Sequence, residues 1–181
     1  MNSKREVFIS VDVETSGPIP GEYSVLTIGA CLVDDPGTRF STRLKPISDK
    51  ADPDAMAVTG LSLDELSLTG VDPAIGMAQF QSWIEGAAGM DGQPVFVGFN
   101  AAFDWSFVNY YFHRFLGCNP FGFAALDIKS FFMGVAGCSW AETKSSRMAQ
   151  ALNPMHHGEH DALQDAIYQA ELFRLARGLG K

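Results

Sequence analysis

The stretch Val7-Phe8-Ile9-Ser10-Val11-Asp12-Val13-Glu14-Thr15-Ser16-Gly17 decides how the rest of the chain is interpreted. It has the character of a short apolar β-strand, and the period of two places Asp12 and Glu14 on the same face before glycine ends the strand. On its own, such an acid pair is typical of a solvated strand end. The alternative is a site for a hard cation, because Mg²⁺ and Mn²⁺ prefer carboxylate oxygens on a rigid element.

Composition limits the classes of protein that fit. The 181 residues, of which 46% are hydrophobic, predict a single domain spanning 1–181. A formal charge of -8 with 13 scattered Lys and Arg argues against a protein that grips long duplex nucleic acid through many phosphate contacts. The composition is still compatible with binding a short strand or a chain end, whose phosphates would be held by metal ions.

Cysteine usage and hydropathy indicate where the protein works. Cys31, Cys118 and Cys138 are widely spaced and form no C-x-x-C motif, which predicts reduced thiols and a cytoplasmic protein. No apolar run approaches the roughly 20 residues of a membrane span, so we expect a soluble protein without a membrane partner.

The remaining pattern predicts alternating strands and helices. The first three strands are expected to form a meander, and Asn100 is expected to cap the long aromatic helix. Two helices are expected to stop at Gly86 and Gly178. Predicted strands cover residues 7–14, 25–33, 39–45, 94–99 and 124–128. Predicted helices cover 52–68 in short pieces, 72–86, 101–117, 129–135, 146–152 and 161–177, with a loop at 137–145.

Further acids stand at strand ends or in first helical turns. Asp104 follows a strand directly, and Asp165 lies near the start of the last helix. On one continuous helix His160 and Asp165 would lie about 140° apart, so they converge only if His160 precedes the helix. Asp161 as N-cap with Gln164 at N3 gives that arrangement.

A cluster of these acids needs a reason. At an effective dielectric near 20, each close pair of carboxylates would cost about 4 kcal/mol without cations. Two divalent cations would neutralise the cluster and leave room for a phosphate. Crevices at the carboxyl ends of strands are also where open α/β sheets form their sites.

Three motifs resemble one known family. They are Asp12-Val13-Glu14-Thr15-Ser16-Gly17, Gly98-Phe99-Asn100-Ala101-Ala102-Phe103-Asp104, and His160-Asp161-Ala162-Leu163-Gln164-Asp165-Ala166. Together, and in this order, they resemble the DEDDh 3′-5′ exonucleases, which include RNase T and bacterial proofreading subunits. The resemblance implies an α/β, RNase H-like fold, a mixed five-stranded sheet with helices on both faces. It also implies that Asp12, Glu14, Asp104 and Asp165 hold two divalent cations, Mg²⁺ or Mn²⁺, and that His160 is the catalytic base.

The resemblance also suggests substrate contacts. It points to Thr15 for the sugar or phosphate end and to Leu61 and Phe103 for the terminal base. For Asn100 the two alternatives are a helix cap and a substrate contact. For Leu61 and Phe103 they are packing within the protein and contact with the base. Lys129 and Arg147 are cations that could meet phosphate, although a solvated surface is the more ordinary role. The family often has His where Phe99 stands, a position that is not a metal ligand.

The sequence therefore predicts a metal-dependent exonuclease that shortens single-stranded RNA or DNA from the 3′ end and releases nucleoside 5′-monophosphates. The alternative is a non-catalytic subunit that uses the same fold to bind nucleic acid or a polymerase, and the complete set of acids with His160 argues against it. A homodimer or a polymerase partner is compatible with the resemblance. The choice between RNA and DNA is left open by the sequence.

Overall fold

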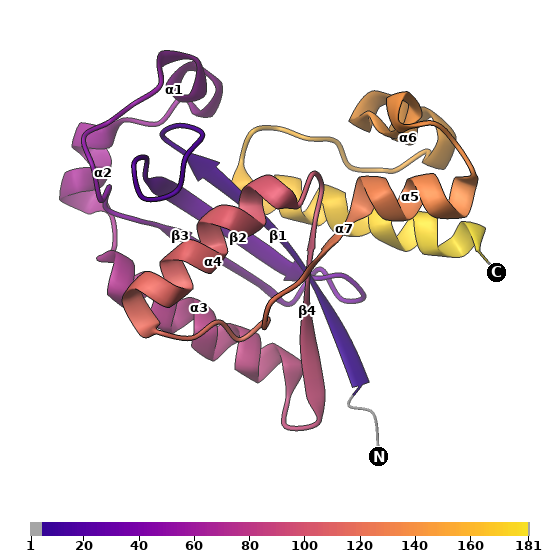
Figure 1. The fold of residues 1–181 in the computed structure, drawn as a ribbon, viewed down its shortest axis with the longest axis horizontal. Coiled ribbons are helices and arrows are strands. Elements are labelled where there is room, and N and C mark those ends of the chain that lie inside the picture. Colours follow the sequence, from indigo (N-terminus) through magenta and orange to yellow (C-terminus); the bar gives the residue numbers. More distant parts are fainter. Residues whose placement is uncertain (1–4, 181) are drawn as a thin grey trace.

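A computed structural model describes residues 5–180, in which a mixed sheet carries the acid-bearing strand at its centre (Figure 1). The strand order is β3-β2-β1-β4-β5, in a sheet of 5 strands. The first three strands pair antiparallel, as predicted, while β4 and β5 run parallel to β1 and to each other. The strands are β1 (Arg5–Thr15), β2 (Val25–Leu32), β3 (Arg39–Arg43), β4 (Gly92–Gly98) and β5 (Ala125–Asp127).

Helices cover both faces of this sheet, which confirms the predicted fold class. Helices α3 and α4 pack on one face, and α5, α6 and α7 gather on the other. The helices are α1 (Pro53–Thr59), α2 (Leu63–Thr69), α3 (Pro73–Ala88), α4 (Ala102–Leu116), α5 (Ile128–Ala136), the 3₁₀ turn η1 (Trp140–Thr143), α6 (Ser145–Leu152) and α7 (Ala162–Leu179). Within residues 5–180, no helix has the length and apolar character that crossing a membrane would need.

The alternation along β1 divides its side chains between two cores. Val7, Ile9 and Val11 are buried against α3 and α4, in a core rich in aromatic rings. The opposite parity, which includes Asp12 and Glu14, faces the side on which α7 packs. From Val7 onward the strand thus buries one face and uses the other face, near its carboxyl end, to present two acids.

Two expected helix stops lie inside helices. Gly86 is within α3, whose C-cap is Gly89, and Gly178 is within α7, whose C-cap is Gly180. Packing of the apolar faces of both helices outweighs the cost of roughly 1 kcal/mol that a helical glycine carries relative to alanine. The loop expected at 137–145 also contains the short turn η1.

The expected cap of α4 is wrong. The N-cap is Ala101, without a side-chain cap bond, and Asn100 is an exposed residue with a φ of 60°. Asn tolerates this left-handed conformation better than most residues, and the chain uses it to turn from β4 into the helix. The Ala101 amide instead donates to Asp127 Oδ2 at 2.9 Å, which ties the start of α4 to the end of β5.

Candidate active site

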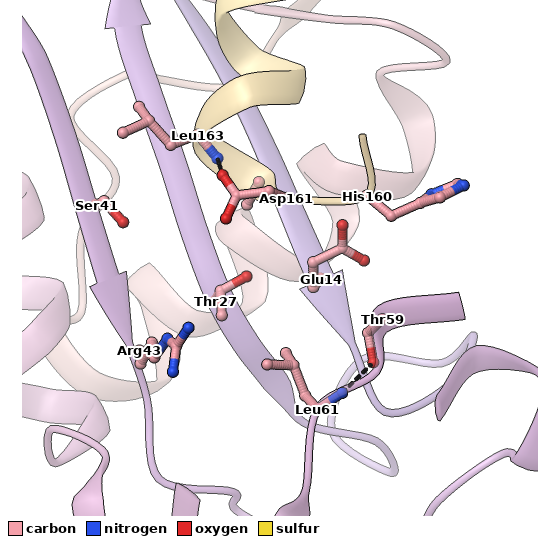
Figure 2. A pocket seen from close by; sticks show the side chains of 10 residues that line it. Glu14, Thr27, Ser41, Arg43, Thr59, Leu61, His160, Asp161 and Leu163 are labelled. Atoms are coloured by element: carbon pink, nitrogen blue, oxygen red, sulfur yellow. Dashed lines mark hydrogen bonds between the residues drawn. The ribbon is translucent and has the colours of Figure 1, made fainter. Parts of the chain in front are cut away.

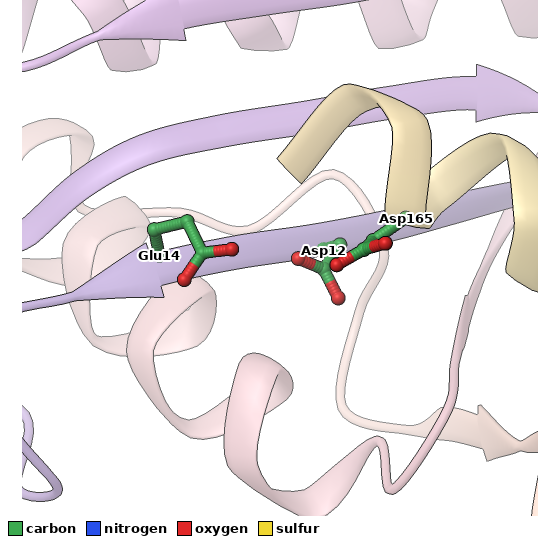
Figure 3. A group of neighbouring side chains, drawn as sticks. All are labelled: Asp12, Glu14 and Asp165. Carbon is green, nitrogen blue, oxygen red and sulfur yellow. The ribbon is translucent and has the colours of Figure 1, made fainter. Parts of the chain in front are cut away.

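Three carboxylates converge at the carboxyl end of β1. Asp12, Glu14 and Asp165 each place one oxygen within 4.8 Å of the others, and all three side chains are half-buried. Figure 3 shows Asp165 reaching from α7 towards Asp12, with Glu14 further along the strand. Residues far apart in sequence are therefore brought together as predicted. Three hard oxygen donors this close together could hold a divalent cation.

The packing of α7 on the sheet delivers Asp165 to the cluster. A side-chain Cβ at Gly29, which pairs with Asp12, would lie 2.2 Å from the Ala162 backbone. Glycine is thus required for the first turn of α7 to lie directly on β2. Asp161 is the N-cap and accepts from the amides of Leu163 and Gln164 at 3.1 and 3.0 Å, as predicted.

Asp104 lies beside this cluster but is oriented differently. It is buried in the first turn of α4, and its Oδ1 accepts a hydrogen bond of 3.1 Å from the Val13 amide. Its carboxylate is outside the group of three, although its charge acts on Asp12. Burial raises the pKa of Asp104 to about 7, and the Val13 amide opposes that rise. The fourth predicted acid is therefore adjacent to the others and anchored to the strand that bears them.

Burial and mutual repulsion make the cluster unfavourable when fully ionised. Burial raises the pKa of Asp12 well above its usual value, and the charges of Asp104, Glu14 and Asp165 raise it further. Burial likewise raises the pKa of Glu14 to about 7, with a further rise from Asp165 and a lowering by His160. A nearby cation lowers the pKa of a carboxyl group and would therefore oppose the rise at both Asp12 and Glu14. The electrostatics fit a site that is completed by metal ions.

Gln169 holds Asp12 in place. Its Nε2 donates to Asp12 Oδ1 at 2.6 Å, and its Oε1 accepts from the Phe99 amide at 2.9 Å. The side chain is 6% exposed and lies one helical turn after Asp165. One amide thus fixes a carboxylate on β1 and the residue that follows β4. Sequence reasoning missed this residue, although a Gln inside the apolar run Ala166-Ile167-Tyr168-Gln169-Ala170 is itself a signal of a buried polar contact.

His160 stands immediately before α7, as predicted. It is exposed, has a φ of 55°, and has no hydrogen bond to its ring within residues 5–180. The preceding amide, of Glu159, donates to Asp165 Oδ1 at 2.8 Å, so the loop is folded around that carboxylate. Figure 2 shows the imidazole directed away from Glu14. Such open geometry is common for catalytic groups before substrate binds.

A cavity of about 140 Å³ extends from Glu14 and His160 across β2 and β3 (Figure 2). Leu61 lines it from the loop between α1 and α2, and Arg43 lines it from the edge strand β3. Thr27 lies on its floor, with a buried hydroxyl that has no hydrogen-bond partner in the described part of the chain. This side of the acid cluster is therefore hollow and contains both apolar and polar groups.

The predicted substrate contacts differ in how accessible they are. Leu61 lines the cavity, and Phe103 is 36% exposed with its ring 5.2 Å from that of Phe107. Thr15 is buried, and its hydroxyl donates to the Gly17 carbonyl at 2.9 Å. Asn100 is exposed in the turn before α4. Leu61 and Phe103 thus have surface to offer a ligand, whereas the Thr15 hydroxyl is already used by a turn.

A second buried polar residue of α7 organises the loop before His160. Glu171 is 5% exposed and accepts from the amides of Met155 and His156 at 2.9 and 3.0 Å. It also pairs with the His156 ring at 2.6 Å. These bonds lower the pKa of Glu171, against the effect of burial, which is the larger single influence and raises it. Through these contacts with Glu171, His156 helps to hold the loop against α7.

Comparisons with known proteins identify the family of this chain. A family model described as an exonuclease, of the RNase T type, matches residues 9–173. A "3'-5' DNA exonuclease Cap18" from Escherichia coli is 59% identical over 175 residues, which cover 97% of this chain and 94% of that protein.

Solved structures share the fold at lower identity. Escherichia coli exonuclease I with a dT13 oligonucleotide aligns with a TM-score of 0.72 at 20% identity over 96% of this chain, which spans 41% of that longer protein. The nuclease domain of 3'hExo, a DEDDh family member bound to rAMP, aligns with a TM-score of 0.75 at 14% identity, over 98% of this chain and 95% of that one. The family model and the relative agree, and the chain belongs to the RNase T family of exonucleases.

Proposed function

We propose that this protein is a metal-dependent exonuclease that shortens single-stranded DNA from its 3′ end and releases nucleoside 5′-monophosphates. The observation that carries the proposal is the convergence of Asp12, Glu14 and Asp165 within 4.8 Å, beside Asp104 and close to His160. The preference for DNA over RNA is supported by the relative at 59% identity, which is named as a DNA exonuclease. RNA remains the competing substrate.

Asp12, Glu14 and Asp165, with Asp104 beside them, would hold two divalent cations, Mg²⁺ or Mn²⁺. The donor set fits, since all ligands are hard oxygens and burial has made the ionised forms of Asp12 and Glu14 costly without a counter-charge. A pair of cations bound there would stabilise the attacking and leaving oxygens of an in-line displacement at phosphorus. Gln169 keeps Asp12 oriented for that role by bonding one of its oxygens.

His160 is proposed to accept the proton of the attacking water. An imidazole has a reference pKa near 6.5, so its neutral form is available as a base around neutral pH. The Glu159 amide, by binding Asp165, holds the loop so that His160 is next to Glu14 and the cavity. Its exposed side chain has room to turn inward when substrate arrives.

The terminal nucleotide is proposed to lie against Leu61 and Phe103. Leu61 lines the cavity together with Glu14, Phe103 is exposed directly before Asp104 in the chain, and stacking with a base is tolerant of sequence. Thr15 would contribute through its backbone, because its hydroxyl is engaged with Gly17. Asn100, exposed at the start of α4, is proposed to contact the same nucleotide.

The surroundings of the enzyme are a separate proposal. Three free cysteines, one of them buried, support a reducing, cytoplasmic setting. A homodimer or a polymerase partner would be compatible with the fold. A non-catalytic subunit is less well supported, because a binding module would have no need of buried acids that repel one another.

The decisive assay uses 5′-labelled single strands. Purified protein is incubated with DNA or RNA of matched sequence in Mg²⁺ or Mn²⁺, with Asp12→Asn as the control. We expect stepwise shortening from the 3′ end that is faster on DNA and absent in the control. Faster shortening of RNA would overturn the substrate assignment, and no shortening of either polymer would favour the binding subunit.

A further inference from the structure

The basic segment, residues 128–152, differs in charge from the rest of the chain. It forms α5, η1 and α6 and contains three cations, Lys129, Lys144 and Arg147, against one acid, Glu142. Its net charge is thus +2 in a chain of formal charge -8. Figure 1 shows this segment packed beside α7, the helix that carries Asp165. A local excess of cations in an acidic protein attracts phosphates to one place.

Trp140 projects from this segment with 53% of its surface exposed. The Nζ of Lys129 lies 4.2 Å from the centre of its ring and 5.8 Å from that of Phe99. The indole is borne by a well-fixed turn, because Ser139 and Glu142 form a capping box and Thr143 donates to the Trp140 carbonyl at 2.8 Å. A rigid, exposed ring beside a cation is the combination that binds single-stranded nucleic acid.

Hydrogen bonds connect the surroundings of Lys129 to the acid cluster. The Phe99 amide donates to Gln169, whose other end bonds Asp12. Lys129 follows Asp127, which ends β5 and accepts from the amide at the start of α4. The segment is also fixed to α7, because the hydroxyls of Ser145 and Tyr168 lie 3.0 Å apart. The basic segment is therefore attached to the strand ends and to the helix that carry the acids.

The sheet order gives the substrate a direction. The acid cluster is on the central strand β1, the cavity with Leu61 extends over β2 and β3, and the basic segment follows β5 on the opposite side. With the terminal nucleotide between Leu61 and Phe103, the side of β4 and β5 is open to the rest of the strand. It would there pass from a negative surface to a positive one.

We propose that the basic segment binds the unpaired strand on the 5′ side of the scissile bond, with a base stacked on Trp140 and a phosphate beside Lys129. This inference rests on the proposed exonuclease activity, and it adds a surface that a single nucleotide does not reach. The enzyme thus binds longer single strands more tightly than very short ones.

The test separates the surface from the reaction centre. Trp140→Leu removes the ring and keeps an apolar side chain, Trp140→Phe keeps a ring, and Lys129→Gln removes the charge. Arg114→Gln is the matched control, since Arg114 also lies over aromatic rings, at 5.7 and 5.4 Å, but near the far end of α4. Each variant is assayed with the p-nitrophenyl ester of thymidine 5′-monophosphate and with oligothymidylates of increasing length.

We expect Trp140→Leu to raise KM for the long oligothymidylates by about 5- to 150-fold, the equivalent of one lost stacking contact. Turnover of the mononucleotide ester stays unchanged. Trp140→Phe recovers most of the loss, Lys129→Gln reduces the salt dependence of binding by about one phosphate contact, and Arg114→Gln changes neither. Unchanged oligonucleotide binding in both Trp140→Leu and Lys129→Gln, or an equal loss on the ester, would overturn the proposal.

A binding measurement keeps this inference independent of the activity itself. Fluorescence anisotropy of a labelled oligothymidylate is followed with each variant in an Asp12→Asn background, in which turnover is blocked. Weaker binding on loss of the ring supports the surface even if the wild-type protein released no nucleotides, a result that would remove only the exonuclease proposal. Equal binding with and without Trp140 removes the surface.

Discussion

Asp12 is held in place by its neighbours whereas His160 is not, although both are assigned to one reaction. Asp12 lies on the central strand, where Gln169 bonds its carboxylate and α7 packs across the neighbouring Gly29. His160 is an exposed residue of the loop before α7, and its ring has no hydrogen bond within residues 5–180. The groups that would hold cations are fixed in advance, whereas the proposed base is free to move towards its partner.

This contrast follows from what each group must do. Carboxylates that share a cation have to be held close together in spite of their repulsion, so rigid elements and buried hydrogen bonds are needed. A base that serves one proton transfer per cycle benefits from access to solvent, where its proton is released. The first comparison to make is therefore between a variant that lacks the Asp12 carboxylate and one that lacks the His160 imidazole.

The largest effect is expected for Asp12→Asn. The substitution keeps the shape and an acceptor for Gln169, but removes one of the converging charges. Because such ligands contribute several kcal/mol of transition-state stabilisation, kcat should fall by about 1000-fold or more. Single-turnover assays in Mg²⁺ measure this, and calorimetric titration of the metal should show a lost or weakened site. Retention of at least one tenth of the rate would contradict the ligand assignment.

His160→Gln should cost about 100- to 10,000-fold in kcat, the usual contribution of a general base. Metal affinity and oligonucleotide binding should stay near the wild-type values, because the side chain is exposed and bonds none of the acids. His157→Gln is the matched control, since it removes an exposed imidazole from the same loop. If both variants lose rate equally, the loop and not the imidazole is responsible.

The same contrast explains what could be predicted from the sequence. Asp12 and Glu14 are recognisable because a strand period of two and a following glycine constrain them, and His160 because Asp161 is a good N-cap next to it. These are local rules. Asn100 was mistaken for a cap because the competing partner of the helix start, Asp127, comes from a strand that is distant in sequence.

Gln169 was missed for a related reason. A single glutamine in a helix has no local pattern that names its partners, and here they are Asp12 and Phe99, which lie on two other elements. Only the packing of α7 against β1 and β4 brings the three together. Local propensity thus predicted the elements and most of the acids, while the bonds that orient them depend on tertiary contacts.

An intermediate effect is expected for Gln169→Leu, which removes the hydrogen bond to Asp12 and leaves the charge of Asp12 unchanged. Loss of such a supporting bond typically weakens metal binding by about 10- to 100-fold. We expect that change in the titrated affinity for Mn²⁺, with KM for a mononucleotide ester less affected than kcat. Gln164→Leu, an exposed position on the same helix, is the control and should change neither. Equal metal affinity in Gln169→Leu and the wild type would show that Asp12 needs no such support.

The smallest effect concerns the metal-free protein and its stability against pH. The pKa values of Glu14 and Asp104 are each raised to about 7 in the folded chain, mainly by burial, from ordinary values of 4.5 and 3.8. A raised pKa means that the folded state binds protons that the unfolded state has already released, so stability falls as pH rises from about 4 through 7. The metal-free Tm should therefore drop by several degrees between pH 5 and pH 8, relative to Asp12→Asn, in which one repelling charge is absent.

Mg²⁺ should restore the wild-type Tm at pH 8 but not at pH 5, because only the ionised cluster binds it. Thermal unfolding of both proteins in EDTA and in Mg²⁺ measures this. If Tm depends on pH in the same way in both proteins, repulsion among the acids does not destabilise the folded state.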